Sequence, residues 1–405
     1  MNKRIASCVG VVLWASSGLA ALGQISPSDG SDGVFNPTSN VTIDLSEAAV
    51  GPWDSTPHAV GKGVYDPDQW AVVFHYQSVN VPSGVTVSFL NNHANAPVVW
   101  LVQGDVTVAG IVDVSAEDWF VASPLRGGNP GPGGFRGGIG YLGLNHPSGS
   151  GFGPGGGMGY PNAGGGSYAT PGRYSSGPTY GNAEIQPLIG GSGGSGSNGS
   201  SWSGAGGGGA ILVASNGTIA VSGNIDASGG RSNAGDGSGG AIRLVADTIT
   251  GNGRLTAQGG NYGWYGGDGR IRLESATISG SLIVSPPSPS YSSTVGAFLS
   301  PATTPRVRIV SIAGVPAPLD PRAEIEFPNP DVSIAEESAV PVVIETRNVP
   351  TDWSVVARVA RKFGAQFSVT AAHQSGDQSL ATWTALISFP NEFSSIQVKA
   401  TAPAQ

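Results

Sequence analysis

The sequence predicts an all-β protein with two parts. The first is a right-handed parallel β-helix-like solenoid with a long glycine-rich insertion, and the second is an immunoglobulin- or fibronectin-like β-sandwich. Three observations predict this fold. The 405 residues include 65 glycines and 30 prolines, which disfavour helices. Four related segments repeat before residue 290, and seven short β-branched runs follow residue 305.

Residues 1–23 have the pattern of a secretory signal peptide. Lys3 and Arg4 precede an apolar run over residues 5–22. We expect cleavage after Gly23, with Ala20 as the other candidate. A retained membrane anchor is disfavoured because no stop-transfer pattern follows the run.

The mature chain is expected to contain no thiol, because the only cysteine, Cys8, lies in the leader. Disulfides and thiolate metal sites are then excluded. Without Lys3 and Arg4 the net charge is −10, which argues against nucleic acid or anionic membrane as a partner. We expect a bacterial protein exported through the Sec pathway, secreted or held at the cell surface, and not inserted in a membrane after cleavage.

Residues 24–290 contain the repeats. Aligned copies begin at Pro97, Ala210, Ala241 and Arg270, and each consists of three short strands separated by Gly/Asn turns. A single copy cannot bury its apolar face, whereas stacked copies pair at ~4.8 Å spacing. An ordinary sandwich remains the alternative, because periodicity does not prove coil geometry.

Alternation along the strands predicts which side chains face inward. The expected inward columns in the first strand are Val98/Ile211/Ile242/Ile271 and Trp100/Val213/Leu244/Leu273. The residues between these columns are Val99, Leu212, Arg243 and Arg272, and the arginines mark an outward face. In the third strand Asp113 and Asp226 form an outward acidic column, continued by Thr256 and Ser285.

Residues 121–209 interrupt the repeat with a glycine-rich excursion. The stretch from Val121 to Ala210 holds 33 glycines, and aromatic residues are spaced through it. Because disordered segments are usually poor in aromatics, we favour an ordered, loop-rich excursion packed on one face of the solenoid over a disordered insertion.

Residues 291–305 are rich in Pro and Ser and predict a linker. Glycine nearly disappears after Arg306, and residues 306–402 are expected to form the sandwich. The expected strands are Val307–Ile312, Ala323–Phe327, Val340–Thr346, Ser354–Arg361, Gln366–Ala371, Ala381–Phe389 and Ser395–Ala400.

Five segments together resemble a widespread, uncharacterised type of secreted bacterial glycine-rich protein. They are SDGSDGVFNPTSNVTIDLS, GKGVYDPDQWAVVFHY, PGPGGFRGG, YGNAEIQPLIGGSGGSG and GSGGAIRLVADTITGNG, which span about residues 28 to 285 with their flanks. The resemblance implies export and a β-helix-like fold. It implies no catalytic residue or ligand.

The sequence contains no catalytic set, metal site or cofactor motif that we recognise. The five histidines have no metal-ligand spacing. Asp113 and Asp226 could act as acid and base on a polysaccharide, but a solvated polar stripe is the favoured explanation, because the column loses its acid in the next two repeats. The sequence favours a protein that is not an enzyme.

Aromatic residues in glycine loops are the better candidates for ligand binding. Tyr262, Trp264 and Tyr265 share one loop, and Trp202 precedes another repeat. Exposed aromatic faces next to polar groups can bind sugars, although packing of these rings on the solenoid or on the glycine-rich excursion is the favoured explanation. For Arg243 and Arg272, ion pairing with nearby Asp247 and Glu274 is the favoured explanation, and binding of an acidic glycan is the alternative.

These features predict an exported structural or adhesive protein whose partner is an extracellular polysaccharide or cell-envelope component. A β-helix lyase or glycoside hydrolase and a carbohydrate-binding protein without catalysis remain alternatives.

Overall fold

The computed structural model describes residues 3–7, 11–12, 25–122, 126–294, 304–321, 330–335, 339–389 and 391–403. These residues form an all-β protein with one short 3-10 helix, Leu45–Glu47. No helix within these ranges is long and apolar enough to cross a membrane.

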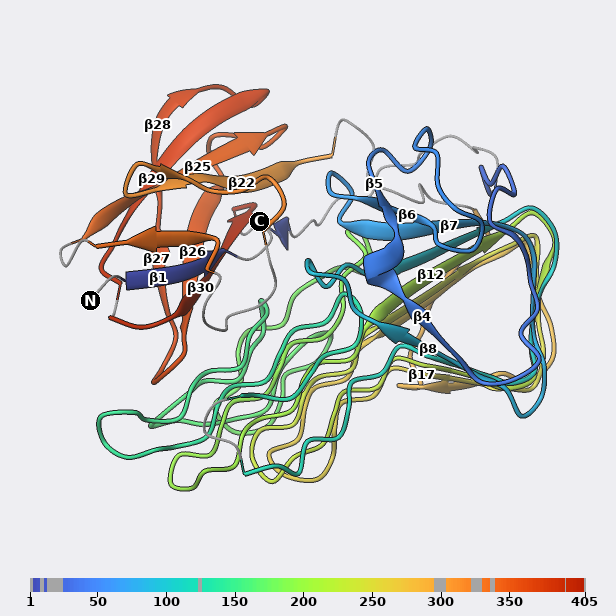
Figure 1. Ribbon diagram of the computed structural model, residues 1–405, viewed down its shortest axis with the longest axis horizontal. Coiled ribbons are helices and arrows are strands. Elements are labelled where there is room, and N and C mark those ends of the chain that lie inside the picture. The colour runs from blue at the N-terminus through green and yellow to red at the C-terminus, as the bar shows by residue number, and fades with distance from the viewer. Residues whose placement is uncertain are drawn as a thin grey trace.

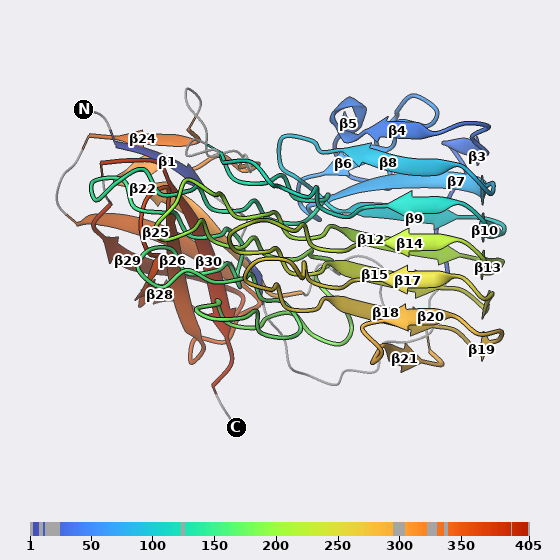
Figure 2. The same cartoon turned by 90° about the horizontal axis from the view of Figure 1, so that it is seen from below.

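The repeats form stacked layers of parallel strands (Figure 2). The large, strongly curled sheet holds β9 (Val98–Val102), β12 (Ala210–Ser215), β15 (Ala241–Val245), β18 (Arg270–Glu274), β21 (Ser290–Ser292), β10 (Val106–Val108), β13 (Thr218–Val221), β16 (Thr248–Thr250) and β19 (Thr277–Ile278). A second sheet holds β11 (Ile111–Asp113), β14 (Asn224–Asp226), β17 (Arg254–Thr256) and β20 (Ile283–Ser285). The second sheet lies beside the curled one, so each repeat contributes to both.

The strand register matches the predicted alignment. Val98, Ile211, Ile242 and Ile271 are successive Cα partners. Asp113 and Asp226 are also partners, followed by Thr256 and Ser285. Both inward columns of the first strand are buried in one core cluster. Alternation therefore assigned the inner face correctly.

A further layer precedes the first recognised repeat. It contains β3 (Gly33–Phe35), β4 (Val41–Asp44), β5 (Ala49–Val50), β6 (Val64–Asp66), β7 (Ala71–Val81) and β8 (Thr86–Leu90). The long strand β7 pairs with both β9 and β10, and β8 pairs with β11. At the other end β21 pairs with β18, so the sheet continues into the stretch expected to begin a linker.

The outer face of the curled sheet is covered. Val99, Leu101, Leu212, Ala214 and Val245 form a second buried cluster, against which Ile25, Trp53 and Leu188 pack. Arg243 lies in this face and is only 1% exposed. The expectation that Arg243 marks a solvent-facing column is therefore wrong, because segments distant in sequence cover that face.

The glycine-rich residues 126–209 run as long extended segments side by side, without regular strands (Figure 1). One dipeptide, Gly204–Ala205, hydrogen-bonds to four other segments: Gly128 and Gly194 donate to it, and it donates to Gly138 and Gly235. A β-strand pairs with two neighbours at most, so this packing is a bundle rather than a sheet. Neighbouring backbones touch directly, which leaves no room for side chains at many glycines.

The C-terminal residues form two largely antiparallel sheets that share one apolar core. One contains β24 (Val332–Ile334), β1 (Lys3–Ser7), β30 (Ser394–Thr401), β26 (Ser354–Arg361), β27 (Phe367–Thr370) and β2 (Val11–Val12). The other contains β23 (Val315–Pro316), β22 (Arg306–Ile312), β25 (Val340–Arg347), β29 (Leu380–Ile387) and β28 (Ala372–Gly376). Six expected strands coincide with these, and Ala323–Phe327 lies outside the described residues.

Two contacts link these sheets to other parts of the chain. The backbone of β1, within the predicted leader, pairs with β24 and β30. The glycine bundle also docks on the sheets: Gln366 N donates to Ser150 Oγ (2.9 Å), and the buried Arg358 donates to the carbonyl of Gly156 (3.1 Å). The two sheets are therefore packed against the bundle and are not merely tethered to it.

Candidate ligand-binding surface

The predicted aromatic loop, residues 260–268, has exposed rings and a fixed backbone. The Tyr262 side chain is 59% exposed and meets Phe120 edge-on, with ring centroids 4.9 Å apart. Tyr174 is 75% exposed and meets Trp264 at 6.4 Å. We call Phe120, Tyr174, Tyr262, Trp264 and Tyr265, together with Arg173, the aromatic surface.

Arg173 contributes the cation of the aromatic surface. Its guanidinium lies 4.4 Å from the centre of the Tyr265 ring, and its backbone N–H donates to the Tyr265 carbonyl. The aromatic surface thus draws on segments 118–121, 173–174 and 262–265. Two of these, with Phe120 and Tyr174, were not recognised from the sequence, because their partners are distant along the chain.

The buried carboxylate of Asp236 fixes the backbone of the aromatic loop. Asp236 accepts hydrogen bonds from the N–H groups of Tyr262 (2.7 Å), Gly263 (2.9 Å) and Ser232 (2.7 Å). Burial nevertheless raises the pKa of Asp236 to about 6. The loop is therefore held by a group that titrates in the mildly acidic range.

Asp236 is expected to make stability pH-dependent. Because its folded pKa lies above its ordinary value, its stabilising contribution is full below about pH 4 and is lost as the pH rises through about 6. Asp236→Asn should be less stable than the wild type, by an amount that shrinks between pH 4 and 7 by at most about 3 kcal/mol. Thermal unfolding at both pH values measures this change.

Asp377→Asn is the control for that titration. The pKa of Asp377 is lowered by hydrogen bonds from Ser379 and Leu380, so its contribution is lost on acidification instead. The stability difference for this variant should therefore stay nearly constant between pH 4 and 7 and shrink only at lower pH. An equal trend in both variants would contradict the assignment to Asp236.

The other predicted ligand residues lie elsewhere. Trp202 closes a separate turn, in which its carbonyl accepts from Ser197 N (2.9 Å). Arg272 is paired with Glu274 (2.6 Å), which also binds the buried Arg243 (2.8 Å). This places both arginines in a structural ion cluster beneath the covering segments.

The acidic column does not form a shared cavity. Asp113 accepts from Ser115 N and Asp226 accepts from Ser228 N, both at 2.9 Å, so each carboxylate caps its own turn. Asp113 lines a cleft, whereas Asp226 does not. Both carboxylates are therefore engaged in local turn hydrogen bonds, and only Asp113 lines this cleft.

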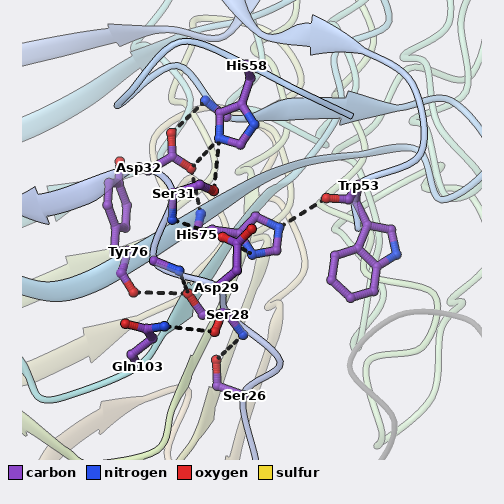
Figure 3. A network of polar contacts seen from close by, with 12 residues as sticks. Ser26, Ser28, Asp29, Ser31, Asp32, Trp53, His58, His75, Tyr76 and Gln103 are labelled. Atoms are coloured by element: carbon purple, nitrogen blue, oxygen red, sulfur yellow. Dashed lines mark hydrogen bonds and ion pairs between the residues drawn. The ribbon is translucent and has the colours of Figure 1, made fainter. Parts of the chain in front are cut away.

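A Ser–His–Asp group near the N-terminal layer has the residue types of a catalytic triad (Figure 3). Ser31 Oγ and Asp32 Oδ2 both approach the same nitrogen of His58, Nε2, at 3.4 and 3.2 Å. Nucleophile activation needs the acid and the hydroxyl on opposite ring nitrogens. Asp32 instead accepts hydrogen bonds from His75 N (2.6 Å) and Gly63 N (3.1 Å). These bonds hold the segment around Asp32 against strand β7.

Within the described ranges no three His, Cys, Asp or Glu side chains are grouped to hold a metal ion. Comparison with protein-family models, curated proteins and solved structures finds no significant match to this chain.

Proposed function

We propose that this chain is an exported, non-enzymatic structural or adhesive protein that holds extracellular polysaccharide or cell-envelope glycan. In this proposal the stacked repeats are a parallel β-helix-like solenoid, the C-terminal sheets are an immunoglobulin-like sandwich, and residues 1–23 are removed as a signal peptide. The leader pattern, the register of the repeats and the low content of charge support it.

The aromatic surface is the observation that carries the proposal. Several large rings remain exposed although apolar groups gain about 25 cal/mol per Å2 on burial. The backbones of Tyr262 and Trp264 are fixed by Asp236 and by the bond from Trp264 N to Ala234 O (2.8 Å), so little conformational entropy would be lost there on binding. Rings held in this way suit stacking against the apolar faces of sugars.

Carbohydrate binding without catalysis is thus the activity we assign to the adhesive protein. A lyase or hydrolase is the weaker candidate, because Asp113 and Asp226 are engaged in separate turns and do not share a cavity. Catalysis by a pair of carboxyl groups requires both to face one scissile bond.

Replacing Tyr262 or Trp264 by alanine is expected to weaken polysaccharide binding at least about tenfold, which corresponds to the loss of one stacking partner. Glycan-array binding of the mature protein, followed by titration of the best glycan, measures this effect. Tyr291→Ala is the matched control, since Tyr291 is 60% exposed on β21 and belongs to no part of the aromatic surface.

A reducing-end release assay separates binding from turnover. We expect no release by the wild-type protein. Turnover that disappears in Asp226→Ala would favour the enzyme instead. Full glycan binding by both aromatic variants would contradict the aromatic surface as the binding site.

A further inference from the structure

A separate cleft of about 600 Å3 lies where β8 and β11 end. Its walls come from the loop 91–95, from residues 113–117 and from the start of the glycine-rich segment, residues 126–136. The volume is within the range of small-molecule sites, roughly 300–1,000 Å3. The aromatic surface does not line this cleft, so the inference below does not rest on the proposed function.

Two asparagines in the cleft wall carry buried polar atoms without a partner. Asn92 and Asn95 are 6% and 5% exposed, and within the described residues neither Asn92 Nδ2 nor Asn95 Oδ1 makes a hydrogen bond. The other side-chain atom of each is engaged, because Asn92 Oδ1 accepts from Ala96 N (2.9 Å) and Asn95 Nδ2 donates to the Gly134 carbonyl. These bonds fix both amides and leave one donor and one acceptor.

A buried polar atom of this kind lowers the stability of the fold unless a hydrogen-bond partner is present. A buried polar atom without a hydrogen bond costs about 1–3 kcal/mol. A ligand hydroxyl can accept from an amide N–H such as Asn92 Nδ2, and it can donate to an amide oxygen such as Asn95 Oδ1. The two asparagines therefore match a hydroxylated ligand better than an apolar one.

The remaining wall combines aromatic and balanced polar groups. Trp70, Phe89 and Phe135 supply apolar surface. Arg126 donates to Asn129 (3.1 Å), which donates to Glu117 (3.2 Å), so the rim is a connected polar chain. Two carboxylates, Asp113 and Glu117, and two guanidiniums, Arg126 and Arg136, line the cleft, and this balance fits a neutral ligand.

We propose that this cleft binds a short neutral saccharide, with Asn92 and Asn95 pairing with its hydroxyl groups and the aromatic wall covering its apolar face. It would act as a carbohydrate site of its own, specific for one sugar unit or two, whether or not the aromatic surface binds a glycan. The ends of β8 and β11 hold the site in a rigid sheet, which supports selective recognition.

The test uses the variant Asn92→Asp. A carboxylate keeps the acceptor for Ala96 N, replaces the free donor by a second acceptor and adds a negative charge, which the control below also adds. Glucose, galactose, N-acetylglucosamine, cellobiose and diacetylchitobiose would be offered to the mature protein at about 10 mM, enough to saturate a site with a Kd of roughly 1 mM. Saturation-transfer NMR and calorimetry should show binding of at least one sugar, and Asn92→Asp should weaken it at least about tenfold.

Asn36→Asp is the matched control, because Asn36 is exposed on the surface and its Oδ1 also accepts a hydrogen bond, from Asn80 (3.0 Å). It should bind as the wild type does. Tyr262→Ala should also leave this binding unchanged, which separates the cleft from the aromatic surface. If no sugar binds the folded wild type, or if folded Asn92→Asp binds equally well, the cleft holds only water and the proposal is overturned.

Discussion

Gly237→Ala is expected to prevent folding, or to lower the free energy of unfolding by about 3 kcal/mol or more, at the upper end of overpacking costs. A Cβ at this position would lie closer than 3.0 Å to the carbonyl group of Gly206. The three atoms within 3.0 Å of this Cβ, the carbonyl O and C of Gly206 and the N of Gly207, all belong to backbone in the glycine bundle. Backbone held by hydrogen bonds on several sides cannot move away as a flexible side chain can.

Gly199→Ala is the matched control, because nothing lies within 4 Å of a Cβ there and its backbone φ is not positive. This variant should unfold within about 0.5 kcal/mol of the wild type, as surface substitutions usually do. Soluble yield and urea-induced unfolding of the mature protein measure both variants. Equal stability of Gly237→Ala and Gly199→Ala would mean that the bundle is not close-packed.

The repeats were predictable because their signal is local. Val98, Ile211, Ile242 and Ile271 follow the same two-residue alternation, and aligned copies stack in aligned register. Turn glycines and asparagines set the strand lengths. The first layer, with β7, was missed because its sequence does not align with the later copies, although β7 pairs with β9 by the same rule.

The glycine bundle and the ligand sites depend on contacts between distant segments. The glycine content shows that many positions lack a side chain. It does not show which backbone segments pack into the space that the missing side chains leave. Phe120 reaches Tyr262 only through the stacking of two loops more than a hundred residues apart. The cleft likewise needs residues 91–95 and residues 126–136 together. Sequence alternation contains no information on such pairings.

The burial of Arg243 likewise could not be predicted from the sequence around it. Alternation placed it correctly on the face opposite the core, beside Leu212 and Arg272. An arginine in that position normally indicates solvent. Here Leu188 and its neighbours cover the face, and Arg272 itself reaches the carbonyl of Ala183 (3.4 Å). The covering segment follows a long glycine-rich stretch, so no local sequence pattern predicts that it covers this face.

Glu274→Leu should therefore be among the most damaging single substitutions in the stacked sheets. Glu274 is fully buried and binds Arg243 at 2.8 Å, so its removal leaves a buried cation without its carboxylate. Losing one partner of a buried pair costs about 3–5 kcal/mol. Chemical unfolding of the single variant, compared with the wild type, measures the loss.

The exposed ion pair between Glu345 and Arg308 provides the control for the buried pair. Glu345→Leu removes the carboxylate that binds Arg308, an exposed side chain, at 3.0 Å, and it should cost no more than about 1 kcal/mol. The double variant Arg243→Leu/Glu274→Leu should regain part of the stability lost in Glu274→Leu, because Leu212 and Val245 already make this layer apolar, while Arg272 still lacks the carboxylate it binds at 2.6 Å. If the double variant is as unstable as the single one, the buried charge of Arg243 is not the cause of the loss.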